Sequence, residues 1–386
     1  MITRRSLLKS ALLPLAPTVP LFIARSVRAA APEKDARVLV VVEMDGGNDA
    51  LNTVVPHADE AYIRLRPKLN VNPANVVKLT DGVGLHPALR PLDKLLQAGH
   101  LAVVPGVGYP NPSRSHFDSM ATWHTAGLDA EARKGYGWLG RALDPSGGHL
   151  FAVGGEVPPA LRGRRSSAVA FKRLEEVLLA DPGAAKAGAG QTGGNDLFEF
   201  VRRQSVEAHG AAEKLASLAG SRGGATYPQT ELAERLKLVA QLLKADIGAR
   251  VFYAQQSGYD THAQQQFTHS GLLGEFAGAV AAFFADLAEA KLADRVTLLS
   301  FSEFGRTIRE NGSAGTDHGT VGACFVAGPS VRGGLVGAMP SLTELDAGEP
   351  KATTDFRGVY RAVLTDFMGV PADGALKAGA EVKLFR

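Results

Sequence analysis

The chain has 386 residues, of which 45% are hydrophobic and 21% are charged, a composition typical of a soluble globular protein. Its one cysteine, Cys324, excludes an intrachain disulfide and lies in an apolar run, as a buried thiol would. Five of the 42 Lys and Arg residues lie in the first 31 residues, which contain no acid; the other 37 face 39 Asp and Glu, with no basic stripe of the kind that binds nucleic acid.

Residues 1–31 are predicted to be a signal peptide of the twin-arginine type. Arg4 and Arg5 precede a 14-residue apolar stretch with three prolines, too short to span a membrane, and small residues follow it. Arg25 and Arg28, near the expected cleavage site at 29–31, favour the twin-arginine translocase over the general secretory route. We therefore expect a periplasmic or secreted protein without a stable membrane span; a basic amphipathic N-terminus is the alternative.

Apolar runs and helical patterns then alternate along the chain. Runs at 38–43, 101–108, 250–257, 295–301 and 323–328 predict strands, and the first, which is continuously aliphatic, suits a central strand covered on both faces. The segments 86–100, 113–126, 230–248 and 271–292 predict helices, with Thr230 as a cap. The alternation implies an α/β fold with a mostly parallel central sheet.

The pattern weakens between residues 155 and 228. A low-complexity Gly/Ala stretch, DPGAAKAGAGQTGGND, lies between flanks that look helical. We interpret 155–228 as a helical, partly low-complexity cap inserted into an α/β domain of residues 32–386.

Polar residues gather where the predicted strands end. In a parallel sheet these ends share one edge, outside which ligands bind, so we expect the side chains to converge there. They are Asp45 after the first strand, Ser113, Ser115 and His116 after the second, Asp260 and His262 after the third, Glu303 after the fourth, and His318 directly before a further strand.

Carboxylates and imidazoles together are common ligands of zinc, iron or manganese, and all-oxygen sets suit magnesium or calcium. Asp260 and His262, two residues apart, would share a face of an extended segment and hold one cation with His318. Asp45 and Glu303 would form a second, oxygen-rich position. A serine at a helix N-terminus beside them would be an activated nucleophile.

Each residue also has a structural interpretation. Asp45 fits a turn in DGG, Ser113 and Ser115 fit helix caps, and His116 can simply orient a neighbour. Glu303 can pair with Arg306, and Asp317 can cap a turn. An oxidoreductase with an organic cofactor has little support, because no GxGxxG follows the first strand and no ligand cluster for haem or iron–sulfur is present.

Several long motifs together resemble the exported family known as domain of unknown function 1501, over about residues 37–386. They are EMDGGNDALNTVVP, GLHPAL, GVGYPNPSRSHFDSMATWHTA, GWLGR, GYDTHAQQ, SEFGRTIRENGSAGTDHGT and TTDFRGVY. That family is distantly similar to the alkaline phosphatase and sulfatase superfamily. The resemblance implies a three-layer sandwich, a metal-binding Asp45, a nucleophile at Ser115 or Ser113, and metal ligands at Asp260, His262 and His318.

Two positions depart from the superfamily pattern. One residue separates Asp260 from His262 where three are usual, and Phe304 stands where an Asp-His pair would place a second imidazole. We expect a metal-dependent hydrolase of phosphate or sulfate esters, acting on a small-molecule or glycan ester. Its divalent cations would be zinc, magnesium, manganese or calcium, with Arg114 or Arg306 neutralising the transferred group. The alternative is a non-catalytic cell-envelope binding protein of the same fold.

Overall fold

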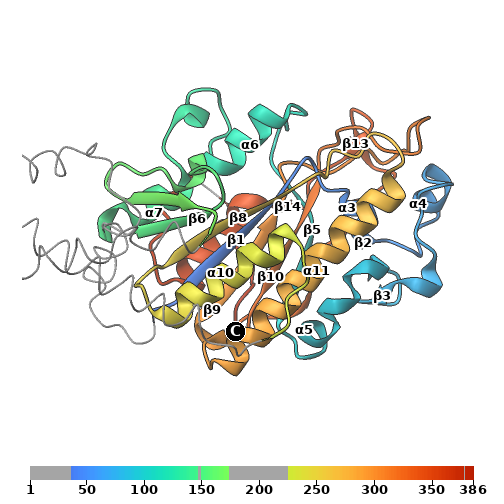
Figure 1. Ribbon diagram of the computed structural model, residues 1–386. Helices are drawn as coiled ribbons and strands as arrows, with labels where there is room; N and C mark the ends of the chain where they lie inside the picture. The colour runs from blue at the N-terminus through green and yellow to red at the C-terminus, as the bar shows by residue number, and fades with distance from the viewer. Residues whose placement is uncertain (1–35, 147–148, 174–224, 378) are drawn as a thin grey trace, which may run out of the picture.

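The computed structural model describes residues 36–146, 149–173, 225–377 and 379–386. The predicted signal peptide and most of the predicted cap, residues 174–224, lie outside these ranges. The described residues form an α/β fold with one large, mostly parallel sheet and helices on both faces, which confirms the predicted fold class (Figure 1).

The large sheet has the strand order β11-β5-β10-β9-β1-β8-β6-β7, with β14 also pairing with β5. Its strands are β1 (Val38–Asp45), β5 (Leu101–Gly108), β6 (His149–Val153), β7 (Ser167–Phe171), β8 (Val251–Ser257), β9 (Val296–Phe301), β10 (Gly322–Ala327), β11 (Gly334–Leu335) and β14 (Thr354–Asp355). Small sheets join β2 (Val54–Val55), β4 (Gly84–Leu85) and β3 (Val77–Lys78), and β12 (Leu345–Asp346) with β13 (Glu349–Pro350). All five predicted strands are present.

β1 lies at the centre of the sheet because its run of aliphatic residues can be buried on both faces. Val38, Val40 and Val42 belong to one core and Leu39 and Val41 to the other. α10 (Glu231–Ala245), α11 (Gln265–Glu289) and the 3₁₀ helix η2 (Pro87–Leu92) contribute to the first core. α6 (His116–Thr125), α7 (Trp138–Leu143) and α12 (Phe356–Ala362) contribute to the second, so the molecule has three layers.

The remaining helical segments are short. They are α3 (Ala50–Thr53), α4 (Glu60–Leu65), α5 (Asp93–Gln97), η1 (Pro73–Asn75), η3 (Ala132–Lys134), η4 (Asp144–Ser146), η5 (Pro159–Leu161), η7 (Ala293–Arg295) and the π-helical turn η8 (Val363–Phe367). The helix predicted over 86–100 is η2 followed by α5, because Pro91 inside the segment interrupts a regular α-helix. α11 is long and apolar enough to cross a membrane, but 56% of its most apolar window is buried inside the protein, as in a core helix.

Part of the predicted cap belongs to the main sheet. β7 pairs in parallel with β6 at the sheet edge, so the range 155–173 does not stand apart from the α/β domain. The run Ser167–Phe171 has only five residues, which is too short to show a clear periodicity, so its sequence does not distinguish a strand of the main sheet from part of an insertion.

One strand runs against the others. β10 is antiparallel to both β9 and β5, while β1, β8, β9 and β6 are mutually parallel. From the sequence we expect His318 at the edge formed by the strands' carboxyl ends. If the strand after it were parallel to the others, His318 would lie at the opposite edge of the sheet. Because β10 is antiparallel, its amino end lies at the carboxyl ends of its neighbours, and His318 does reach that edge.

Candidate metal centre

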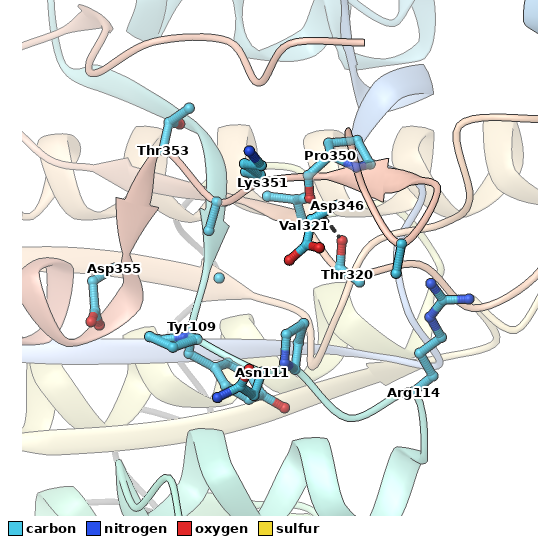
Figure 2. A pocket seen from close by; sticks show the side chains of 15 residues that line it. Tyr109, Asn111, Arg114, Thr320, Val321, Asp346, Pro350, Lys351, Thr353 and Asp355 are labelled. Atoms are coloured by element: carbon cyan, nitrogen blue, oxygen red, sulfur yellow. Dashed lines mark hydrogen bonds between the residues drawn. The ribbon is translucent and has the colours of Figure 1, made fainter. Parts of the chain in front are cut away.

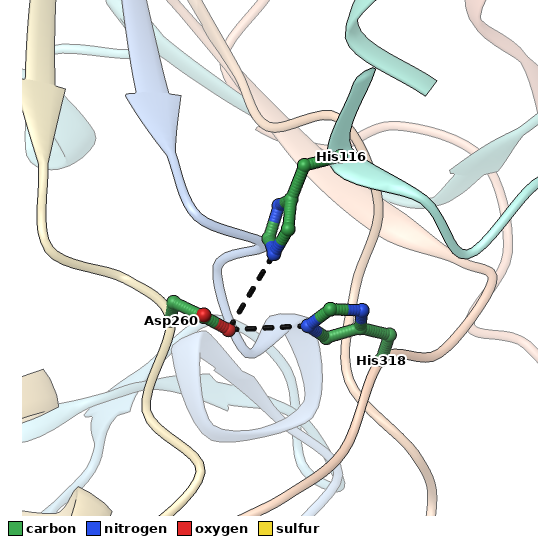
Figure 3. A group of neighbouring side chains, drawn as sticks. All are labelled: His116, Asp260 and His318. Carbon is green, nitrogen blue, oxygen red and sulfur yellow. Dashed lines mark hydrogen bonds and ion pairs between the residues drawn. The ribbon is translucent and has the colours of Figure 1, made fainter. Parts of the chain in front are cut away.

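Three histidines and one aspartate from separate segments meet at the carboxyl edge of the sheet. Asp260 and His262 lie in the loop after β8, His116 is the first residue of α6, and His318 precedes β10. Ligand atoms of His116, Asp260 and His318 all lie within 4.8 Å of one another, and Figure 3 shows the two rings directed at the carboxylate. The structure thus brings together the predicted Asp260, His262 and His318, and adds His116.

A single oxygen, Asp260 Oδ1, is the centre of the cluster. His262 Nε2 lies 3.0 Å from it, His318 Nε2 3.1 Å and His116 Nε2 3.6 Å. The Nε2 atoms of His262 and His318 are 2.9 Å apart. The Nε2 atom of each ring therefore lies within 3.6 Å of this oxygen.

The other nitrogen of each ring is held by an oxygen of the protein. His116 Nδ1 lies 2.7 Å from Glu303 Oε1, His262 Nδ1 3.1 Å from Asp317 Oδ1, and His318 Nδ1 2.8 Å from the backbone oxygen of Arg114. A backbone carbonyl and an ionised carboxylate only accept hydrogen bonds, so each Nδ1 carries the proton. Metal-ligating histidines are oriented in the same way in proteins.

These contacts decide what the cluster can bind. An imidazole protonated on Nδ1 alone presents a lone pair at Nε2, whereas an imidazolium ring donates from Nε2 to Asp260 Oδ1. Two Nε2 lone pairs at 2.9 Å repel unless a proton or a metal ion lies between them. His116, Asp260 and His318 therefore form a set that fits a divalent metal ion, and His262, whose Nε2 lies beside Asp260 and His318, can add a fourth donor.

The carboxylate is fixed from below by Arg306. Arg306 Nη2 donates to Asp260 Oδ1 at 2.7 Å, and its other bonds go to backbone oxygens of Gly46, Gly47, Tyr259 and Thr316. Burial opposes ionisation of Asp260, but Arg306 and His318 hold its pKa below the usual value. The Arg306 side chain is fully buried, so it positions Asp260. It cannot neutralise a transferred group, which corrects the expectation from the sequence.

The DGG turn after β1 supports this arrangement through its two glycines. A Cβ on Gly46, which has φ of +113°, would lie 2.6 Å from the backbone nitrogen of Asp260. A Cβ on Gly47, with φ of +75°, would lie 2.3 Å from the ring of Phe304. The turn therefore needs glycine both for its conformation and for close approach to the loop that carries Asp260.

Glu303 has a different place from the one predicted. Its Oε1 accepts from the Gly46 backbone N–H at 3.0 Å as well as contacting His116, and its Oε2 accepts from Ser302 Oγ at 3.0 Å. Both oxygens are thus engaged by the protein. Glu303 orients His116, and the hydrogen bond between them raises the pKa of His116.

Asp45 lies near the cluster without joining it. Burial raises the pKa of its carboxyl, the Glu303 and Glu43 carboxylates raise it further, and a hydrogen bond with Ser257 opposes the shift. With Glu303 engaged elsewhere, the expected second cation position of Asp45 and Glu303 has no assembled ligand set. Among the described residues the gathered group of His and acid ligands consists of His116, Asp260 and His318, and both Asp45 and His262 lie outside it.

Phe304 packs against the ligand rings. Its ring centroid lies 4.9 Å from that of His116 and 4.8 Å from that of His318, and the residue is 1% exposed. In the sequence, Phe304 stands where the superfamily pattern places a ligand. In the fold it restricts the rotation of two histidine rings.

The two candidate nucleophiles differ in their surroundings. Ser113 Oγ contacts Asp118 Oδ2 at 3.5 Å and accepts from the backbone N–H of Ser115 at 3.1 Å. Ser115 is exposed at the N-cap position of α6, makes no capping hydrogen bond, and directly precedes His116. Of the two serines, Ser115 is the more exposed.

Three elements of the site were missed from the sequence. Asp317 was read as a turn cap, the Arg114 backbone was not considered, and His116 was assigned to catalysis or orientation and not to the metal. The adjacency of Asp317 and His318 in TDHGT was a usable signal for the first, since a carboxylate beside one ligand can support another. The role of a backbone carbonyl leaves no trace in the residue types.

Comparison with known families gives a match to the family described as "Protein of unknown function (DUF1501)", covering residues 108–366. This range includes His116, Asp260, His262 and His318, and it confirms the resemblance drawn from the motifs. Comparison with curated proteins gives no match.

Solved structures to which the chain is similar include phosphatases and sulfatases. For a sulfatase from Pseudoalteromonas sp. the TM-score is 0.38 at 12% identity, covering 96% of this chain and 77% of that chain. For a putative sulfatase from Bacteroides thetaiotaomicron the TM-score is 0.40 at 8% identity, covering 89% of this chain and 73% of that chain. For alkaline phosphatase from the Antarctic bacterium TAB5 the TM-score is 0.34 at 11% identity, covering 76% of this chain and 92% of that chain.

Proposed function

The chain belongs to the DUF1501 family, and we propose that it is a metal-dependent hydrolase of phosphate or sulfate esters. The observation that carries the proposal is the convergence of three Nε2 atoms on Asp260 Oδ1 while each Nδ1 is held by an acceptor. The site is open to solvent, since the side chains of His116, His262 and Asp260 are 33%, 44% and 48% exposed. A substrate can therefore reach it.

His116, His262, His318 and Asp260 would hold the metal ion. Three imidazoles favour zinc or manganese over magnesium and calcium, which prefer oxygen ligands. The ion supplies Lewis acidity, which stabilises negative charge on the phosphoryl or sulfuryl oxygens. Glu303, Asp317 and the Arg114 carbonyl keep the three rings in the orientation that presents Nε2.

Ser115 is the proposed nucleophile. Its Oγ would form a bond to phosphorus or sulfur as the bond to the ester oxygen breaks, with its proton passing to solvent and the leaving oxygen taking one up. Water would then release phosphate or sulfate and restore the serine. The free hydroxyl of Ser115, its position beside His116 and the backbone N–H groups at the start of α6 support this role.

Metal analysis and turnover of aryl esters test the proposal. Purified protein should contain bound metal and hydrolyse 4-nitrophenyl phosphate or sulfate after loading with zinc or manganese. Ser115→Ala should lower kcat by at least about 100-fold, with metal content and melting temperature unchanged. Ser113→Ala, which removes the other candidate hydroxyl two residues before Ser115, is the matched control and should retain activity. Absence of turnover with zinc, manganese, magnesium and calcium alike would contradict the proposal.

A non-catalytic role is the second candidate, because four protein ligands can complete a tetrahedral metal site, as structural zinc sites do. In that case the metal would stabilise the edge of the sheet and the protein would bind a cell-envelope partner. Removal of metal would then lower the melting temperature by several degrees, and Ser115→Ala would change nothing that can be measured.

Export by the twin-arginine translocase is part of the proposal. Arg4 and Arg5 support it. The double substitution Arg4→Lys and Arg5→Lys should leave the protein in the cytoplasm of a bacterial host, as cell fractionation would show; an unchanged periplasmic or secreted fraction would contradict it.

A further inference from the structure

A cavity of about 480 Å³ lies beside the histidine cluster, in a size range common for small-molecule sites. Its walls are the segment Tyr109–Arg114 before α6, Thr320 and Val321 before β10, and the β12–β13 hairpin with the residues that follow it. In Figure 2, Tyr109 and Asn111 lie on one side of the hollow and Lys351 and Asp346 on the other.

The cavity and the metal centre share a wall. Arg114 lines the cavity with its side chain while its backbone oxygen holds His318 Nδ1 at 2.8 Å. Thr320, on the opposite wall, comes two residues after His318, and its Oγ1 donates to the backbone oxygen of Pro350 at 3.1 Å. A substrate with its ester group at the metal can therefore extend into the cavity.

The charged side chains of the cavity are only partly used by the protein. Asp355 is held by Arg357, with Nη2 to Oδ2 at 2.5 Å. Arg114, Lys351 and Asp346 are exposed and form no ion pair within the described part of the chain. Two cations and one carboxylate are thus available to a ligand.

Glu349 is the acidic residue whose charge acts on Arg114, but it forms no ion pair with Arg114 among the described residues. It is 6% exposed, and its Oε2 has no hydrogen-bond partner within the described ranges. Burial raises the pKa of Glu349, and Arg114 only partly opposes this shift. No ion pair forms between the two, so the guanidinium of Arg114 remains free to bind an anion.

From this set of groups we propose that the cavity binds a polyhydroxylated organic anion, such as an acidic sugar. Arg114 and Lys351 would bind its negative group, and Asp346 and Asn111 would accept and donate hydrogen bonds to its hydroxyls. The inference rests on the proposed function to the extent that this anion is the part of the ester beyond the transferred group. Binding itself needs no turnover.

Calorimetric titration with D-glucuronate and D-glucuronamide, which differ in one charge, tests the inference. The purified protein should bind glucuronate at least about tenfold more tightly than the amide at low ionic strength. Arg114→Gln and Lys351→Gln should each weaken glucuronate binding by about five- to tenfold and leave amide binding unchanged. Lys383→Gln, an exposed cation outside the cavity, is the matched control.

Equal affinity for acid and amide, no binding of either, or unaffected binding in both cavity variants would overturn the inference. Titrating protein treated with a chelator as well separates the cavity from the metal, because the preference for the acid should survive metal removal. If the protein hydrolyses 4-nitrophenyl esters but binds acid and amide equally, only the inference about the cavity is wrong. If it prefers the acid but hydrolyses no ester, the proposed hydrolase activity is wrong and the inference about the cavity stands.

Discussion

Two histidine-containing clusters near the DGGND segment use the imidazole ring differently. In the metal centre, each Nδ1 is held by the protein and each Nε2 faces the other ligands. In the second cluster, which we call the buried network and which consists of Asn48, Asp49, Arg66 and His269, His269 Nε2 is 2.8 Å from Asn48 Oδ1. Arg66 Nη1 and Asp49 Oδ2 are 2.6 Å apart, with both side chains fully buried.

The comparison shows what separates a ligand histidine from a structural one. Burial lowers the pKa of His269 to about 4, so this ring stays neutral and its Nε2 proton is used within the protein. The network has its charges paired and its hydrogen bonds made. In the candidate metal centre, in contrast, the Nε2 atoms of three partly exposed rings meet at one carboxylate oxygen, an arrangement that fits a metal ion.

The largest expected effect on stability comes from breaking the buried ion pair. Arg66→Ala leaves Asp49 charged, buried and unpaired, which should lower the free energy of unfolding by about 3–5 kcal/mol. Urea denaturation measures it, with Arg64→Ala as control, an exposed residue in the last turn of α4, whose C-cap is Arg66. Metal content per folded molecule should be unchanged; if it falls with stability, the two clusters are not separate units.

The buried network should also make stability depend on pH. His269 is protonated below about 6.5 when unfolded but only near 4 when folded, so its contribution is complete above pH 6.5 and is lost as pH falls. At pH 4 the loss amounts to about 3 kcal/mol. Asp49 acts in the same direction at lower pH, because Arg66 overcomes the effect of burial and lowers its pKa.

Urea titrations between pH 7 and 4 on the wild type and on His269→Gln measure this dependence. The variant should be less stable at pH 7 and should lose less on acidification. A variant with the wild-type pH slope would mean that His269 does not titrate as proposed.

Removing the oxygen that holds a ligand ring should weaken metal binding without abolishing it. Glu303→Gln can reverse the tautomer of His116 by donating to Nδ1, and should cost about 10- to 100-fold in affinity. Asp317→Asn should cost about tenfold, since Asp317 is 62% exposed. Competition with a chromophoric chelator gives both values, with the exposed Glu344→Gln as control; equal affinities in all three variants would contradict the orienting roles.

The strands and the edge that carries the site could be predicted because long apolar runs and the polar residues after them are local features. Asp260, His262 and His318 were found on this basis. Two buried histidines away from the strand ends have partners within the core: His269 Nε2 lies 2.8 Å from Asn48 Oδ1, and His124 Nε2 lies 2.7 Å from Glu43 Oε2.

The partners of these residues could not be predicted because they depend on strand direction and helix placement. Glu303 faces His116 only because α6 packs beside the end of β9, where Trp123 Nε1 donates to the Glu303 backbone oxygen at 2.8 Å. Arg306 is buried because the DGG turn closes over it. Both are contacts over more than 150 residues, which residue types alone do not encode.

The most direct test of the account is the metal content of the wild type beside that of the double variant Asp260→Asn, His262→Ala, by mass spectrometry after dialysis. The account predicts about one equivalent of zinc or manganese in the wild type and almost none in a folded double variant. A double variant that keeps the full equivalent would contradict the metal centre, and with it the proposed function.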